Sequence, residues 1–275
     1  LLIRKFLSAL STLFSISADQ QTPPGSPIQS LDTARLIVES VVRLGGEEGR
    51  ELDELPLSCL GRLLTIQDRG IRLFLLEQLE RVIESLPAAF VADPMYPILQ
   101  AGFADPHPAV RDATLKAMVV LAPKLPPKIV NGDLLRNFAR LQEDQQPGLR
   151  VNVLVALGRI EPHLSTDIRQ RALGPAYCRG LKDPFAPARL AALTGLTRTA
   201  DRYAEAEVAR ELLPVIVTLL VDSDGEVVTA ARTLVDAFVK RLKALPIPKK
   251  RHSPPTSPTS TNSAVGDAEP QETPK

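Results

Sequence analysis

The stretch KDPFAPARLAALTGL, residues 182–196, decides the fold because its pattern recurs along the chain. It begins with an aspartate and prolines, which are typical of a turn, and continues with small and apolar residues that suit a closely packed helix. Arg189 lies six residues after Asp183. The same two residue types return at a fixed interval elsewhere in the sequence, so the stretch is one copy of a repeated unit.

The interval between copies is 39 residues. Four arginines share it: Arg72, Arg111, Arg150 and Arg189. Four aspartates share it too: Asp105, Asp144, Asp183 and Asp222. Each aspartate lies six residues before the next arginine, or before Val228 in the last copy. An interval near 40 residues is typical of solenoids built from two-helix units.

Each unit is predicted to contain two helices joined by the aspartate-containing turn. In VRDATLKAMVVLA, residues 110–122, apolar side chains recur with helical spacing. Prolines lie in or beside the turns, where the start of a helix tolerates them. The pattern is that of HEAT repeats, and it predicts an all-α fold, a HEAT/armadillo-type α-solenoid. Aromatic residues make up only 4% of the chain, which also favours helix-on-helix packing.

Changes in composition predict three segments. Residues 31–245 are expected to form the solenoid. Residues 1–30 are expected to form an N-terminal helical segment and a linker. Residues 246–275 are rich in Pro, Ser and Thr and nearly free of large apolar side chains, so we expect a disordered tail. No membrane span is expected, since residues 1–17 lack an unbroken apolar run of sufficient length.

The recurring aspartates and arginines are predicted to be structural. An aspartate can accept backbone N–H groups that have no helical partner, capping the second helix or its turn. The arginine is then expected to reach an aspartate in the adjoining repeat. The result is a ladder of charge-assisted hydrogen bonds that sets the stacking register. Val228 interrupts the ladder, as suits a last repeat.

Charge is distributed unevenly although the net charge is only +1. Residues 32–105 carry 7 basic and 13 acidic side chains, whereas residues 111–202 carry 15 and 8. Within the basic part, four cations lie on or near one expected helix: Arg169, Arg171, Arg179 and Lys182. Such a face is suited to an anionic partner, either the phosphates of RNA or an acidic protein. The alternative is that these are solvated charges of a repeat helix.

No pattern in the sequence predicts chemistry. The three histidines, His107, His163 and His252, are far apart, and no Cys/His cluster has zinc-ligand spacing. A serine nucleophile elbow, a Walker loop and the protein-kinase motifs are all missing from the sequence. We therefore predict no catalytic, cofactor-binding or metal-binding residue, and a protein that is not an enzyme.

Four phrases carry a more specific resemblance: residues 71–86 (IRLFLLEQLERVIESL), 115–125 (LKAMVVLAPKL), 134–142 (LLRNFARLQ) and 182–196. They resemble the HEAT region of the N-terminal kinase-like proteins, also called Scy-like pseudokinases. The resemblance covers residues 57–242. It implies a non-catalytic scaffold with a kinase-like domain upstream, and the chain begins with Leu rather than Met, as expected of a fragment.

The resemblance also implies partners and a location. Family members act in coatomer-dependent vesicle traffic between Golgi and endoplasmic reticulum and in nuclear tRNA export. Protein partners including coatomer, and tRNA held by residues 111–202, are therefore the expected partners. The protein is expected to lie in the cytoplasm, to associate with the Golgi and to shuttle to the nucleus. The alternative is another HEAT adaptor, such as a phosphatase scaffold or a transport receptor.

Overall fold

A computed structural model of the chain describes residue 5, residue 8, residues 30–46 and residues 54–246. All regular secondary structure in these residues is helical, and they contain no strand. Residues 1–243 form one compact unit, and residues 244–275 form a second, of which only 244–246 are described. The predicted N-terminal segment and the predicted tail lie almost wholly outside the described residues.

The second helices of the repeats begin at a constant interval. They are α4 (Arg69–Val82), α7 (Pro108–Leu121), α9 (Pro147–Ile160), α11 (Ala186–Arg198) and α14 (Gly225–Lys243). Each starts 39 residues after the one before it. Helix α2 (Leu31–Gly46) packs against α4 and takes the corresponding place ahead of it. Short helical turns follow four of the second helices: η2 (Ile83–Ser85), η5 (Ala122–Lys124), η7 (Glu161–His163) and η8 (Ala200–Arg202).

The first helices are less regular than the second helices. Two are continuous, namely α3 (Glu54–Leu64) and α10 (Thr166–Gly180). The others are built from consecutive segments. The first of these comprises α5 (Ala88–Phe90), η3 (Val91–Met95), α6 (Tyr96–Gln100) and η4 (Ala101–Ala104). The next comprises η6 (Ile129–Leu134) and α8 (Leu135–Leu141), and the last comprises α12 (Glu205–Glu207), η9 (Val208–Leu212), α13 (Leu213–Thr218) and η10 (Leu219–Val221).

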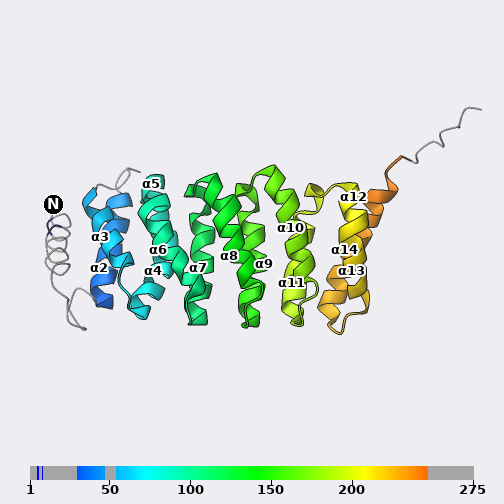
Figure 1. The fold of residues 1–275 in the computed structure, drawn as a ribbon, viewed down its shortest axis with the longest axis horizontal. Helices are drawn as coiled ribbons and strands as arrows, with labels where there is room; N and C mark the ends of the chain where they lie inside the picture. Colours follow the sequence, from blue (N-terminus) through cyan, green and yellow to red (C-terminus); the bar gives the residue numbers. More distant parts are fainter. Residues whose placement is uncertain (1–4, 6–7, 9–29, 47–53, 247–275) are drawn as a thin grey trace, which may run out of the picture. The chain divides into compact units, whose positions relative to one another are not determined.

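Successive second helices pack side by side, in the order α4, α7, α9, α11 and α14 (Figure 1). Helices α7, α9, α11 and α14 also pack on the first helix of their own repeat, as α11 does on α10. The core runs continuously between the two sets of helices. On α7 its members include Val110, Leu115, Met118 and Leu121, which are all at most 1% exposed. Burial of each such side chain contributes about 1.5–3 kcal/mol, and this term makes the stack stable.

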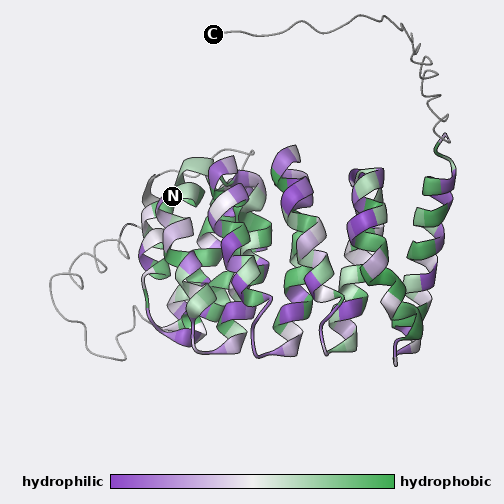
Figure 2. Cartoon of the chain, turned by 45° about the vertical axis from the view of Figure 1, so that its right-hand side comes forward, coloured by the Kyte–Doolittle hydropathy of each residue, from purple (hydrophilic) through white to green (hydrophobic). Residues whose placement is uncertain are grey.

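Amphipathic helices produce this arrangement. Figure 2 shows both hydrophilic and hydrophobic residues on the long helices of the stack. Pro108 and Pro147 start α7 and α9, where the missing N–H would have had no helical partner anyway. None of the described helices has the length and apolar character that crossing a membrane requires. The fold thus sets rows of equivalent side chains at one end of the repeats and along both faces.

Candidate interaction surfaces

The recurring arginines and aspartates meet between adjoining repeats. Arg111, Arg150 and Arg189 each bind the aspartate located 33 residues later through two hydrogen bonds, donated by Nε and Nη2 to the two carboxylate oxygens. The donor–acceptor distances are 2.8 and 2.9 Å, 2.7 and 2.9 Å, and 2.7 and 2.7 Å, respectively. We call these pairs, together with Arg72–Asp105, the ladder.

Arg111, Arg150 and Arg189 each also hold their own turn. Arg150 Nη1 donates to the backbone oxygen of Asp144 at 2.9 Å, and Arg189 Nη1 donates to that of Asp183 at 2.8 Å. The aspartate side chains in turn accept a backbone N–H two residues ahead, as Asp183 does from Phe185 at 2.8 Å. One guanidinium therefore joins the turn of its own repeat to the turn of the next.

The ladder weakens at its first pair. Arg72 reaches Asp105 through a single bond, from Nη1 at 2.9 Å, and its side chain is 24% exposed against 14% for Arg150. At the other end Val228 takes the place of the arginine, so the last described repeat has no guanidinium at that position that could bind a further repeat. The strong pairs are therefore those in the middle of the stack.

The central pairs change the acidity of their carboxyl groups. The hydrogen bond from Arg150 holds the pKa of Asp183 below its usual value, against an opposing effect of burial. The hydrogen bond from Arg189 does the same for the pKa of Asp222. Both aspartates are charged at neutral pH, and the pairs are largely shielded from water, so they are ion pairs of the charge-assisted type.

The four cations predicted for an anionic partner do not lie in equivalent surroundings. Arg171 and Lys182 are exposed, and Arg171 pairs with Asp167 on the same exposed turn of α10. Arg179 is also exposed, and it donates from Nε and Nη2 to Gln142 Oε1 of the preceding repeat at 3.1 and 2.7 Å. These three residues remain available on and just after α10, and we call them the α10 cations.

Arg169 has a different environment from the α10 cations. Its Nε lies 2.8 Å from Glu161 Oε1, and its Nη2 donates to the backbone oxygen of Leu164 at 3.1 Å. The side chains of the pair are only 17% and 12% exposed. A buried carboxylate needs a cation, so Arg169 is committed to Glu161. Glu161 occupies the position that Ala122 and Ala200 occupy in the neighbouring repeats. A glutamate at a position that is otherwise alanine was the signal in the sequence for this pair.

Two grooves on the face formed by the second helices had no counterpart in the sequence predictions. One lies between α4 and α7 and has a volume of about 400 Å³. The other lies between α9 and α11 and has a volume of about 270 Å³. We call them the α4–α7 groove and the α9–α11 groove. Small residues such as Ala113 and Gly158 line the grooves and leave space between the helices. A search for sequence motifs does not detect such space.

Catalytic or metal-binding constellations are not evident in the part of the chain that the structure describes. No group of three or more His, Cys, Asp or Glu side chains there is placed to hold a metal ion. Cys59 and Cys178 are not joined in a disulfide, and burial raises the pKa of both thiols, which disfavours the reactive thiolate. The surfaces with binding potential are therefore the α10 cations and the two grooves.

Comparison with known proteins agrees with this architecture. The HEAT repeat family model matches residues 95–125. A probable inactive serine/threonine-protein kinase, scy1 of Dictyostelium discoideum, is 36% identical over 64% of the chain. Cytoplasmic export protein 1 of Saccharomyces cerevisiae is 29% identical over 65% of it. The chain is homologous to the HEAT-repeat region of the Scy-like proteins. It spans 21% and 24% of the length of these two relatives.

Solved structures resemble the fold of this chain. The crystal structure of Cex1p superposes with a TM-score of 0.72 at 24% identity, covering 88% of this chain and 44% of that one. A designed armadillo repeat protein in complex with a (KR)4 peptide has a TM-score of 0.55 at 15% identity, covering 84% of this chain and 99% of the design. The fold is thus an armadillo/HEAT-type α-solenoid.

Proposed function

We propose that the protein is a non-catalytic scaffold that presents the outer surface of its HEAT solenoid to an anionic partner, with tRNA as the leading candidate. The observation that carries the proposal is the set of α10 cations. Arg179 spans two repeats through Gln142, and Lys182 and Arg171 lie exposed on either side of it in sequence. Rigid stacking through the ladder would hold these charges in fixed positions.

Homology supports the choice of tRNA and of location. One relative is named a cytoplasmic export protein and another a probable inactive kinase. An export role, with the protein shuttling between nucleus and cytoplasm, fits the first name, and a non-catalytic scaffold fits the second. The choice of tRNA as the cargo rests on the basic surface and on the resemblance to the Scy-like proteins. Recognition would rely on the RNA backbone, because aromatic side chains for stacking on unpaired bases are scarce.

The test is tRNA binding, measured by fluorescence anisotropy over a range of salt concentrations. Replacing Arg171, Arg179 and Lys182 together by Gln should weaken binding and lower the slope of log K against log salt by about 2. The matched control removes three exposed charges from α14, through Arg232→Gln, Lys240→Gln and Lys243→Gln. Equal losses of tRNA affinity in both triple variants would mean that only the net charge of the protein matters. An absence of tRNA binding at low salt would refute the proposal.

Coatomer-dependent traffic at the Golgi is the second function that the Scy-like homology favours. It predicts capture of purified coatomer by the protein, unaffected by the α10 substitutions if the two functions use separate surfaces. Another HEAT adaptor role, such as a phosphatase scaffold or a transport receptor, would gain support if the protein captured neither tRNA nor coatomer.

A further inference from the structure

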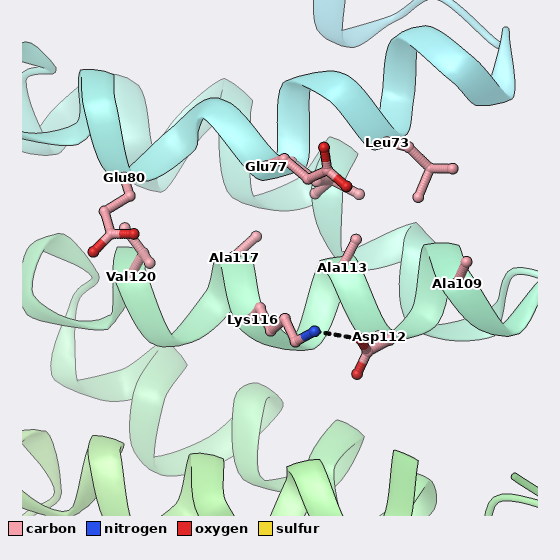
Figure 3. Close-up of a pocket in the computed structure, with 10 residues that line it drawn as sticks. Leu73, Glu77, Glu80, Ala109, Asp112, Ala113, Lys116, Ala117 and Val120 are labelled. Carbon is pink, nitrogen blue, oxygen red and sulfur yellow. Dashed lines mark ion pairs between the residues drawn. The ribbon is translucent and has the colours of Figure 1, made fainter. Parts of the chain in front are cut away.

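The α4–α7 groove differs in charge from the α10 cations and is formed by different helices. Figure 3 shows Glu80 extending from α4 toward Val120 of α7, and Glu77 projecting into the space between the same helices. Lys116 pairs with Asp112 at 2.6 Å, and this pair contributes no net charge to the groove. The two glutamates therefore give the groove a formal charge of about −2.

Neither glutamate is used by the fold. Glu77 and Glu80 are exposed, and neither forms an ion pair or a side-chain hydrogen bond with any residue in the described part of the chain. Asp112, by contrast, is held by Lys116 and also accepts from Asn152 Nδ2 at 2.6 Å. The free carboxylates are thus those on the α4 side, directed over the groove.

The floor between these charges is apolar. Leu73 and Leu76 contribute from α4, and Ala113, Ala117 and Val120 contribute from α7. Along α7 the groove runs from Ala109 to Val120, a length of about 17 Å at the helical rise of about 1.5 Å per residue. Five residues of extended chain, at about 3.3 Å each, have the same length.

The spacing of the carboxylates suits an extended segment as well. Side chains three residues apart on a helix have Cβ atoms about 5–6 Å apart. In an extended chain, side chains two residues apart point the same way and lie about 6.6 Å apart. Two cations separated by one residue would therefore meet Glu77 and Glu80 together, while an apolar side chain between or beside them lies against the floor.

We propose that the α4–α7 groove binds a short linear segment of a partner protein that carries two lysines or arginines near an apolar residue. Charge complementarity and the length of the groove select this occupant. A nucleic acid would be repelled by the unpaired carboxylates. The site is independent of the proposed anionic partner, so the scaffold would hold two partners of opposite charge on different surfaces.

The experiment measures binding of an eight-residue fluorescent peptide, with four lysines and two leucines, to the full chain at low salt. A peptide with glutamates in place of the lysines is the probe control. Glu77→Gln combined with Glu80→Gln should weaken binding about ten-fold, the sum of two partly shielded ion pairs. Ala113→Leu, which leaves the charge unchanged, should also weaken binding by filling the floor.

The matched control combines Asp236→Asn with Glu226→Gln on α14. Asp236 occupies the position in the last repeat that Glu80 occupies in its own, and both control residues are exposed. We expect this variant to bind the lysine peptide as the unmodified protein does. Equal weakening in both double variants, an unchanged affinity for the Glu77/Glu80 variant, or no binding of the lysine peptide at about 100 µM would overturn the proposal. Because tRNA is not involved, these results are independent of those for the α10 cations.

Discussion

The two grooves occupy equivalent positions in the repeats but differ in chemistry. Each lining residue of the α9–α11 groove lies 78 residues after a lining residue of the α4–α7 groove, a separation of two repeats. Leu76 corresponds to Leu154 and Ala113 to Ala191, so part of the lining is retained. The other side chains change, with Glu77 replaced by Val155 and Val120 by Arg198.

This comparison separates positions that form the groove from positions that determine its ligand. The retained leucine is buried in both places, whereas Glu77 and Val155 are exposed at the opening. The α4–α7 groove is acidic, while the α9–α11 groove is mainly apolar with Arg198 at its edge. One backbone arrangement therefore offers two surfaces for different partners, as expected of a solenoid whose repeats share a frame.

The largest expected effect is on the free energy of unfolding, through the ladder that joins the repeats. Arg150→Ala leaves Asp183 without its two hydrogen bonds and the turn at Asp144 without its anchor, at a cost of about 3 kcal/mol. Arg72→Ala, beside the acidic groove, removes only one more exposed bond and should cost about 1 kcal/mol. Urea unfolding of both variants measures the difference. Equal losses would mean that the ladder contributes uniformly.

A smaller loss is expected from a substitution of Gly195, one of the two glycines that line the α9–α11 groove. A Cβ on Gly195 would lie 2.3 Å from the ring of Tyr177, which is fully buried. Gly195→Ala should therefore destabilise the protein by about 2 kcal/mol. The preceding repeat carries Phe138 and Ala156 at the equivalent positions. Phe keeps the two ring carbons at 2.3 and 2.5 Å and loses only the hydroxyl oxygen at 2.8 Å, so adding Tyr177→Phe should restore only a small part of the loss. Full recovery would place the strain at the hydroxyl group instead of the ring.

The contribution of the ladder to the free energy of unfolding should be lost at acidic pH and kept at neutral pH. The pKa values of Asp183 and Asp222 are lowered by their arginines in the folded state. Their stabilisation is therefore complete above the unfolded pKa of about 3.9 and is lost as the pH falls through the lower folded value. The difference in unfolding free energy between the unmodified protein and Arg150→Ala should be constant from pH 7 to 5 and should narrow below pH 4. A constant difference down to pH 3 would contradict the assignment.

Repetition explains which parts of the molecule could be predicted from the sequence. The fold was predictable because Leu115 and Leu154 recur in step with the arginines, and a recurring position must serve a recurring contact. The commitment of Arg169 to Glu161 was not predicted, since it occurs in one repeat only and depends on a long-range contact. The grooves were missed because they depend on the volume left between two helices, which no single segment encodes.

The smallest effect on stability, and the sharpest test of the comparison, comes from exchanging the residues at one position. Glu77→Val gives the acidic groove the residue found in the other groove, and Val155→Glu makes the reverse change. Val155 is 41% exposed and Glu77 forms no ion pair with a described residue, so each change should alter the free energy of unfolding by less than about 0.5 kcal/mol. Glu77→Val should nevertheless weaken binding of the lysine peptide about three-fold, since one exposed ion pair is lost. A loss of stability above about 1 kcal/mol would assign Glu77 to the frame instead, and the distinction between groove-forming and ligand-determining positions would fail at that residue.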